Sequence, residues 1–339
     1  MTNETMLPQT PDGASRIDLD FIKAAKDRIS PYIYETPLLE SPRLNDHLGR
    51  RLLIKAECLQ HTGSFKLRGA SNAIWSLGSD VCHVVAFSSG NHAQGVARAA
   101  ATRGIRATIV MPEDTPRTKI DGTKAYGAEV VTYDRYTESR EEIGAALAKK
   151  YRANLVKPYD DVRVIAGQGT VGLEIAEQAA KMEVSPDAVL CCCGGGGLIA
   201  GLGIALHAKM PDVKIWSAEP QFYDDTKRSL QSGQIERADT SKFSVCDAIV
   251  TPEPGELTFP INKQHLSGGA VVSDEMALRA VTTLFKHLKI VTEPGGAVAV
   301  AAALTGQHPN DAKTIVAVAS GGNIDSDMFR RALDMEPFF

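Results

Sequence analysis

The chain has 339 residues, of which 37 are lysine or arginine and 41 are aspartate or glutamate, so its formal net charge is −4. This length corresponds to about two domains, and the slightly acidic balance excludes a general binder of polyanions such as nucleic acid. With 43% hydrophobic and 23% charged residues, the composition is that of a globular protein and excludes a disordered or fibrous one.

No segment of the sequence predicts export or membrane insertion. Residues 1–12 are polar and lack the basic and apolar regions of a signal peptide. The most continuous apolar stretch, residues 297–304, is far shorter than the about 18 residues of a membrane span and is predicted to be a buried helix. The six cysteines are too sparse for a disulfide framework. We therefore expect a cytoplasmic protein that binds neither membranes nor nucleic acid.

From residue 83 onward, short β-rich runs alternate with alanine-rich stretches that have the apolar spacing of helices. This alternation predicts an α/β fold, in which helical crossovers join parallel strands. Pro158 and the acidic pair after it indicate that the chain crosses between domains within residues 157–169. The predicted strands are residues 83–87, 106–111, 129–133, 154–157, 187–193, 213–218 and 313–319, and the predicted helices are residues 92–102, 138–150, 170–182, 198–209, 274–287 and 325–333.

Four loops rich in glycine or serine are predicted at strand ends, where ligands bind in open parallel sheets. They are residues 88–92, 167–170, 194–197 and 320–323. The third loop stands between an apolar strand and a helix, which is the context of a phosphate cradle built from main-chain N–H groups. The alternative is a tight turn that allows close helix packing.

A second glycine pattern, Gly167-x-Gly169-x-x-Gly172, formally matches the dinucleotide-binding fingerprint, with residues 162–166 as the preceding strand. That fingerprint needs an acidic residue at the end of the next strand, whereas Asp187 opens it. No P-loop and no G-x-S-x-G elbow occurs in the sequence. A nicotinamide enzyme is therefore a minor alternative.

Lys66 lies among glycines and small residues in segment 62–70. As an isolated feature it is a solvated lysine at the start of a helix, which is the usual role of a lysine. A lysine becomes a nucleophile toward carbonyl groups only where burial or a neighbouring cation lowers its pKa. The segment alone leaves both roles open.

Five motifs stand in the order typical of one enzyme family. They are SFKLRGA at 64–70, SSGNH at 88–92, AGQGT at 166–170, GGGG at 194–197 and SGGN at 320–323. In this order they resemble the pyridoxal-phosphate enzymes of the serine/threonine dehydratase and serine racemase family, over about residues 20–335. The resemblance implies the two-domain, parallel-sheet α/β architecture of the tryptophan synthase β-like enzymes (fold type II), with residues 167–172 as a family turn.

By this resemblance the cofactor would be pyridoxal 5′-phosphate, and Lys66 would bind it covalently and then remove the α-hydrogen of the substrate. Phe65 would pack against the pyridine ring, and Asn91 would hydrogen-bond the phenolic oxygen. The phosphate would be bound by Gly194, Gly195, Gly196 and Gly197. Ser320 would face the pyridine nitrogen, where a neutral hydroxyl does not enforce protonation and so favours loss of a β-hydroxyl group over transamination.

The serine-rich loop would hold the substrate. Ser88, Ser89, Gly90 and His92 would bind its α-carboxylate at a helix N-terminus. Ser89 also matches the serine on the opposite face of the substrate in racemases, although dehydratases can carry it too. Arg140 resembles an arginine of the racemase-like branch that meets a second carboxylate, and its alternative role is a surface pair with a nearby glutamate.

The resemblance therefore implies an ammonia-lyase that converts a β-hydroxy-α-amino acid, such as L-threonine or L-serine, to a 2-oxo acid and ammonia. The alternatives within the family are a dehydratase of 3-hydroxyaspartate or of the hydroxyectoine pathway, and a racemase of serine or aspartate. A non-catalytic amino-acid sensor is a remote alternative. The sequence also departs from the family at Ala248, where a glycine is common, and it gives no role to Glu293, which lies in a family loop near the ring.

Segment 219–225 resembles the divalent-cation loop of the family, with the carboxylates of Glu219 and Asp225 and the main-chain carbonyl of Tyr223 as ligands. Hard oxygen ligands suit Mg²⁺, Ca²⁺ or Mn²⁺, whereas the alternative is a solvated acidic loop. The cysteines at 191–193 alternate between the two faces of a strand, so we expect them to be buried and not to bind metal.

The resemblance also implies a large cofactor-binding domain made of residues 1–72 and 160–339, and a small mobile domain made of residues 73–159. We expect the small domain to close over the substrate and exclude water. Relatives are commonly homodimers or homotetramers, and we expect one of these states here.

Overall fold

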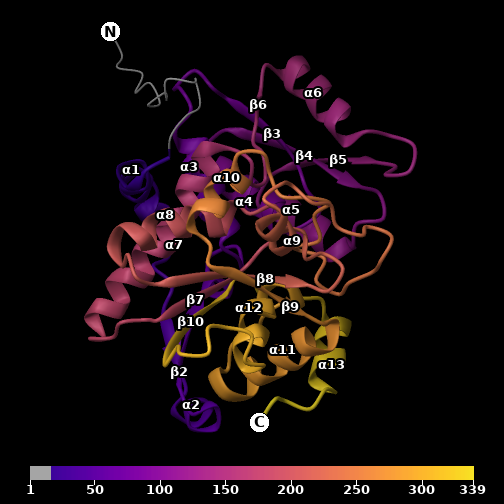
Figure 1. Ribbon diagram of the computed structural model, residues 1–339. Coiled ribbons are helices and arrows are strands. Elements are labelled where there is room, and N and C mark those ends of the chain that lie inside the picture. Colours follow the sequence, from indigo (N-terminus) through magenta and orange to yellow (C-terminus); the bar gives the residue numbers. More distant parts are fainter. Residues whose placement is uncertain (1–16) are drawn as a thin grey trace.

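Strands and helices alternate along most of the chain in the computed structural model, which describes residues 17–339 (Figure 1). The polar start and the first sixteen residues of the predicted large domain lie outside the described residues. The α/β class predicted from the sequence is confirmed.

The strands are β1 Leu38–Glu40, β2 Arg51–Ala56, β3 His83–Phe87, β4 Arg106–Pro112, β5 Glu129–Tyr133, β6 Asn154–Leu155, β7 Ala188–Cys192, β8 Lys214–Pro220, β9 Gly268–Val272 and β10 Thr314–Ala319. The helices are α1 Leu19–Ile29, α2 Pro42–Leu48, α3 Lys66–Trp75, α4 Asn91–Arg103, α5 Arg117–Ala125, α6 Arg140–Tyr151, α7 Val162–Lys181, α8 Gly197–Lys209, α9 Asp225–Ser232, α10 Thr258–His265, α11 Asp274–Leu288, α12 Pro294–Leu304 and α13 Ser326–Leu333. Short 3₁₀ turns occupy Ser30–Tyr32 (η1) and Glu57–Leu59 (η2).

The larger sheet has the strand order β1-β2-β10-β7-β8-β9, and every neighbouring pair is parallel except β1 with β2. Its central strands β7 and β10 are almost entirely buried apolar runs. Such runs are typical of parallel strands that helices cover on both faces. Helices α7 and α8 lie on one face and α11 and α12 on the other (Figure 1).

The smaller sheet is all parallel, in the order β5-β4-β3-β6, and lies at the upper right of Figure 1. Its strands fall within residues 73–159, the segment that the resemblance assigns to the small domain. We propose that this segment is the small domain and that it moves relative to the larger sheet. Its apolar core, on the face that α3 and α4 cover, is separate from the core of the larger sheet, which supports this proposal.

The glycines at 167–172 do not form the turn that the sequence predicts. They lie inside α7, and residues 162–166 begin this helix instead of forming a strand. A Cβ on Gly167 would lie 2.6 Å from the Arg68 carbonyl oxygen, and a Cβ on Gly169 would lie 2.9 Å from that of Gly201. The glycines thus let α7 pack directly against α3 and α8. The dinucleotide fingerprint is therefore wrong, because its glycines serve helix packing.

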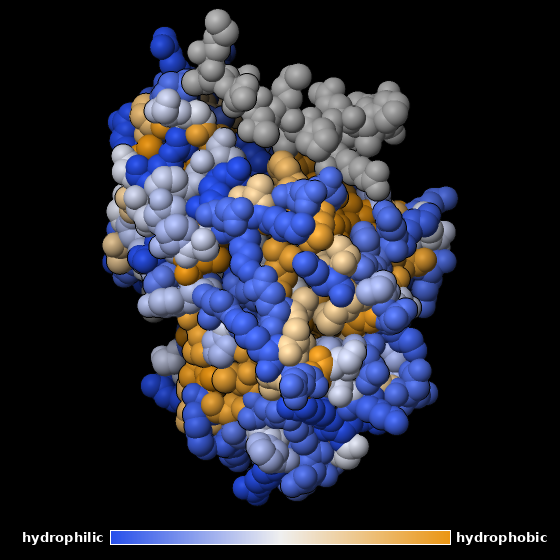
Figure 2. Space-filling view, turned by 90° about the vertical axis from the view of Figure 1, so that its left-hand side faces the viewer, coloured by the Kyte–Doolittle hydropathy of each residue, from blue (hydrophilic) through white to orange (hydrophobic). Residues whose placement is uncertain are grey.

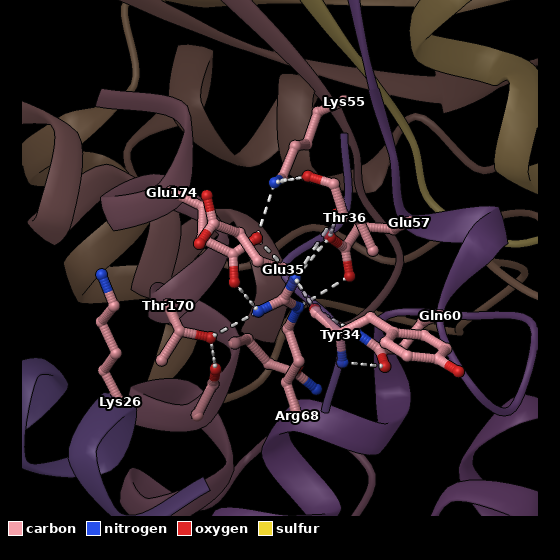
Figure 3. A network of polar contacts seen from close by, with 12 residues as sticks. Lys26, Tyr34, Glu35, Thr36, Lys55, Glu57, Gln60, Arg68, Thr170 and Glu174 are labelled. Atoms are coloured by element: carbon pink, nitrogen blue, oxygen red, sulfur yellow. Dashed lines mark hydrogen bonds and ion pairs between the residues drawn. The ribbon is translucent and has the colours of Figure 1, made fainter. Parts of the chain in front are cut away.

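A buried ionic network joins α3 to the segments around it (Figure 3). The guanidinium of Arg68 donates to Glu57 at 2.8 Å and to Glu174 in α7 at 2.6 Å, and all three side chains are buried. Lys55 in β2 donates to Glu174 at 2.6 Å and to the Thr36 carbonyl at 2.6 Å. Burial is the largest single influence and would raise the pKa of Glu57, but the charges of Arg68 and Lys55 together with the hydrogen bonds to Glu57 outweigh it and lower that pKa. The network thus anchors the start of α3, and with it Lys66, to α7 and to the segment around Glu57.

The surface is largely polar, but hydrophobic side chains gather in a strip across the face that lies on the left of Figure 1 (Figure 2). Exposed apolar area of this kind is typical of surfaces that meet another protein. Within residues 17–339, no helix has both the length and the apolar character needed to cross a bilayer.

Replacing Arg68 by methionine tests the network. Arg68→Met leaves two buried carboxylates without their main partner, so we expect a loss of about 3–5 kcal/mol in the free energy of unfolding. Arg51→Met is the matched control, because it breaks a partly exposed pair with Glu40 and should cost about 1 kcal/mol or less. Urea denaturation compares the two variants, and equal losses would contradict the structural role of the network.

Candidate active site

The carboxyl ends of strands from both sheets face one cavity of about 690 Å³. The loop after β3, the loop after β6 and the segment around Ala248 all contribute to its wall. The sequence predicts a ligand site at strand ends, and the structure brings several of the predicted residues together there. Those that line the cavity are Lys66, Ser88, Ser89, Gly90, Asn91, His92 and Arg140.

Lys66 is the first residue of α3, and part of its side chain reaches the cavity. Its Nζ donates to the Pro158 carbonyl oxygen at 2.8 Å and lies 5.2 Å from the centre of the Phe65 ring. Burial of the ammonium group lowers the pKa of Lys66 to about 8. The group is therefore not a solvated surface lysine, and its neutral, nucleophilic form is available near pH 8.

The four consecutive glycines form a cradle at the start of α8 that larger residues cannot build. Gly196 has a φ of +87°, and a Cβ on Gly194 would lie 3.0 Å from the Ile249 carbonyl oxygen. The Gly195 carbonyl accepts from the Thr258 hydroxyl at 2.6 Å. Within the described residues, the N–H groups of Gly194, Gly195 and Gly196 donate to no protein acceptor. A ring of unused N–H groups at a helix N-terminus fits a phosphate group.

The loop before α4 lines the cavity with residues 88–90. Ser88 Oγ accepts from the Gly90 N–H at 3.2 Å, which tightens the loop. The His92 imidazole is not free to bind a carboxylate, since its Nε2 donates to the Val156 carbonyl at 3.0 Å. Burial lowers the pKa of His92 to about 3, so the ring is neutral. Any contact of His92 with a carboxylate is thereby left to its main-chain N–H.

Asn91 is held between two side chains across the cavity. Its Nδ2 donates to Glu293 Oε1 at 2.5 Å, and its Oδ1 accepts from Asn323 at 2.7 Å. Burial raises the pKa of Glu293 to about 7. The structure thus gives Glu293, to which the sequence analysis assigned no role, the task of orienting the Asn91 amide.

Phe65 and Ser320 are adjacent and lie beside Lys66 without lining the cavity themselves. The Phe65 N–H donates to the Ser320 carbonyl at 3.1 Å, and both residues are buried. Ser320 directly follows β10. The two residues predicted to contact the pyridine ring therefore lie beside Lys66.

Arg140 begins α6 at the mouth of the cavity, and its side chain is half exposed. Its guanidinium lies 5.3 Å from the centre of the Phe87 ring, and its Nε donates to Glu141 at 2.7 Å. Arg140 therefore lies at the cavity, and it also forms the surface pair with a glutamate that was its alternative role.

Two cavity residues, Lys157 and Tyr159, were not singled out from the sequence. They flank Pro158 just after β6, and Tyr159 packs against Gly195 and Gly197. Lys157 is exposed and, within residues 17–339, forms no ion pair. Their position at the carboxyl end of a predicted parallel strand could have identified them as cavity residues.

Glu219, Tyr223 and Asp225 do not line the cavity. Glu219 accepts from the N–H groups of Thr226 and Lys227 at 2.7 and 2.8 Å, while the buried Asp225 Oδ2 has no partner in the described residues. Burial raises the pKa of Glu219 to about 8 and that of Asp225 to about 7. No group of three or more His, Cys, Asp or Glu side chains in residues 17–339 is arranged to hold a metal.

Comparisons with known proteins agree with this geometry. A family model described as pyridoxal-phosphate dependent enzyme matches residues 29–321. The chain is 40% identical to the L-threo-3-hydroxyaspartate ammonia-lyase of Saccharomyces cerevisiae, over 89% of this chain and 91% of the relative. It is 38% identical to the serine racemase of Dictyostelium discoideum, over 94% and 98%. The crystal structure of the threonine deaminase of T.th. matches with a TM-score of 0.86 and 46% identity, over 91% of this chain and 99% of that one.

The lowered pKa of Lys66 predicts how it reacts with an aldehyde cofactor. Incubation of the cofactor-free protein with pyridoxal phosphate, followed by borohydride reduction, is expected to label Lys66. Because the neutral amine is the nucleophile, the labelling rate should rise with pH and level off with a midpoint near the pKa of about 8, well below the ordinary value of 10.5. Peptide mapping identifies the labelled lysine. Labelling confined to Lys157, or undiminished in Lys66→Ala, would contradict the assignment.

Proposed function

The chain belongs to the family of pyridoxal-phosphate-dependent enzymes, and we propose that within this family it is an ammonia-lyase acting on β-hydroxy-α-amino acids. The observation that carries the proposal is that three features lie at the wall of the cavity. They are the amine of Lys66 with its lowered pKa, the glycine cradle with unused N–H groups, and the neutral hydroxyl of Ser320. Tyr159, which lines the cavity, packs against the glycines. Ser320 is hydrogen-bonded to Phe65, next to Lys66.

The residues of the site have distinct roles in this proposal. Pyridoxal phosphate supplies an aldehyde and a ring that takes up the electron pair left when the substrate loses its α-proton. The N–H groups of residues 194–197 bind its phosphate, and the Lys66 amine first binds the aldehyde and later accepts the α-proton. The N–H groups of the loop before α4 bind the α-carboxylate of the substrate. Loss of the β-hydroxyl as water, followed by hydrolysis, yields a 2-oxo acid and ammonia.

Within this class, two cations of the cavity, Arg140 and Lys157, support a substrate with a second carboxylate, although the same lining also holds acidic side chains such as Glu141. Lys157 follows β6, which is the neighbour of β3 in the smaller sheet, and Arg140 stacks on Phe87 at the end of β3. Both cations line the cavity beside the loop proposed to bind the α-carboxylate. The yeast relative is named for 3-hydroxyaspartate. We therefore infer that 3-hydroxyaspartate is a better substrate than L-serine or L-threonine.

A racemase is the second candidate function, and Ser89 is the observation that favours it. Ser89 lines the cavity near Lys66, and a base on each face of the substrate carbon is what inversion of the centre requires. The Dictyostelium relative is named a serine racemase.

Product analysis tests the function. Release of 2-oxo acid from 3-hydroxyaspartate, L-serine and L-threonine is measured together with formation of D-isomers. We expect 2-oxo acid to dominate and Lys66→Ala to abolish it. Arg140→Met should lower kcat/KM for 3-hydroxyaspartate by about 10-fold or more, because a hydrogen bond between charged groups is lost, and should leave L-serine nearly unaffected.

Lys150→Met is the control for the Arg140 variant, since it removes an exposed cation at the other end of the same helix. Formation of D-isomers without 2-oxo acid would overturn the lyase in favour of the racemase. An equal effect of Arg140→Met on all three substrates would overturn the inference of a second carboxylate.

We also propose that Glu219, Asp225 and the main-chain carbonyl of Tyr223 hold a divalent cation such as Mg²⁺, Ca²⁺ or Mn²⁺. Two buried carboxyl groups with raised pKa values and one unpartnered oxygen support this proposal. Carboxylate and carbonyl oxygens are the ligands that these hard cations prefer. A bound cation would compensate the two negative charges.

The raised pKa values predict the pH dependence of this cation effect. Between about pH 5 and pH 8 the folded protein binds more protons at Glu219 and Asp225 than the unfolded chain does, so without a cation their contribution lowers stability as pH rises. A cation binds the ionised carboxylates, so its increase of Tm should be larger at pH 8 than at pH 6. Thermal melting with EDTA or added Mg²⁺, Ca²⁺ or Mn²⁺ measures it. Asp225→Asn should remove the effect and the exposed Asp212→Asn should retain it; a cation effect that survives Asp225→Asn would contradict the site.

We further propose that the protein is a cytoplasmic homodimer or homotetramer. The strip of hydrophobic side chains in Figure 2 supports a contact between copies. Sedimentation analysis tests it, and a monomer at micromolar concentration would contradict it.

A further inference from the structure

We propose that Cys192 is a positioning residue, which orients the hydroxyl group of Ser320 toward the cofactor ring. The inference rests on the role proposed above for Ser320. Cys192 is the last residue of β7, and Ser320 follows the last residue of the neighbouring strand β10. The two side chains therefore meet at the carboxyl ends of the central strands, next to Phe65 and Lys66.

The contact between the side chains of Cys192 and Ser320 is short and buried. Cys192 Sγ lies 3.0 Å from Ser320 Oγ, and Cys192 and Ser320 are only 3% and 4% exposed. The main chain of Ser320 is held on both sides, since its N–H donates to the Gly296 carbonyl and its carbonyl accepts from the Phe65 N–H, each at 3.1 Å. With the main chain held and the side chain buried, rotation of the hydroxyl about the Cβ–Oγ bond is a freedom that remains.

Which of the two groups donates its hydrogen to the other decides where the Ser320 hydroxyl hydrogen points. Each group has one hydrogen, and the thiol is the weaker donor and the weaker acceptor. When the thiol donates to Ser320 Oγ, the hydroxyl hydrogen is left for a better acceptor. Within the described residues the Ser320 hydroxyl has no other hydrogen-bond partner, so the acceptor that this arrangement suits is an unprotonated pyridine nitrogen. In the opposite arrangement the Ser320 hydroxyl would donate its hydrogen to the Cys192 sulfur. The ring nitrogen would then face only lone pairs of the Ser320 oxygen.

Only the middle cysteine of the triplet can have this role. Cys191 Sγ lies against the Cys192 carbonyl oxygen, and Cys193 Sγ lies 3.2 Å from Thr226 Oγ1. All three thiols are free and buried, as the sequence analysis predicted. Because the Cys191 side chain also contacts that of Cys192, Cys193, whose thiol faces Thr226, is the matched control.

The test is a pH titration of the visible absorption of the holoenzyme. In Cys192→Ala the Ser320 hydroxyl rotates freely, donates less well and withdraws less electron density from the ring. We expect the pH midpoint of the cofactor band to move upward by about 0.5 unit or more, with kcat lowered and KM retained. Cys192→Ser keeps a donor of similar shape and should restore the midpoint, whereas Cys193→Ala should leave it unchanged.

A double variant separates action through Ser320 from a general disturbance. Ser320→Ala should shift the midpoint by itself, and adding Cys192→Ala should shift it no further, because both changes remove the same hydrogen bond. An unchanged midpoint in Cys192→Ala, an additive shift in the double variant, or an equal shift in Cys193→Ala would overturn the inference. These results leave the release of 2-oxo acid as an independent measurement, so failure of this inference is distinguishable from failure of the proposed function.

Discussion

The buried compensation of charge around Arg68 is the constraint on which the site depends. Arg68 neutralises Glu57 and Glu174 within one turn of Lys66, and Lys55 shares Glu174. Arg68, and not Lys66, is the partner of these carboxylates, and the Lys66 Nζ has a carbonyl oxygen as its hydrogen-bond partner. A carboxylate beside Lys66 would stabilise the ammonium form and raise its pKa. The network thus allows burial to make a nucleophile of one lysine while a neighbouring arginine stays fully charged.

Glycine has two separate uses in this fold, and the sequence pattern distinguishes them poorly. In α7 the missing Cβ atoms let helices touch, as Gly169 and Gly201 do. At 194–197 they let the chain turn with its N–H groups toward a ligand. Both uses follow from the absence of a side chain, so G-x-G-x-x-G alone does not tell a helix contact from a phosphate loop. Four adjacent glycines are different, since a helix interior does not tolerate such a run.

The parts of the fold that depend on apolar alternation could be predicted from the sequence, and most strands from β3 onward were. Strands β1, β2 and β9 were missed: β1 has three residues, β2 is interrupted by Lys55, and β9 starts with two glycines. The cavity residues on strand-end loops were accessible in the same way. Contacts between strands far apart in sequence, such as Cys192 with Ser320, were not, because pairing of β7 with β10 is a property of the sheet and not of either segment.

The site separates a floor with little charge from a charged rim, and this division fits the chemistry proposed. Burial makes His92 neutral and Ser320 adds no formal charge at the ring nitrogen, while Glu293, with a pKa raised to about 7, changes charge just below the pH range of Lys66. Around pH 8, the titration of Lys66 is then the main change of charge beside the reacting atoms. At the rim, the side chain of Arg140 is half exposed and Lys157 is exposed, and we propose that there they attract and orient an anionic substrate. In this proposal, the proton is transferred at Lys66, and the substrate is recognised by the charged side chains at the rim.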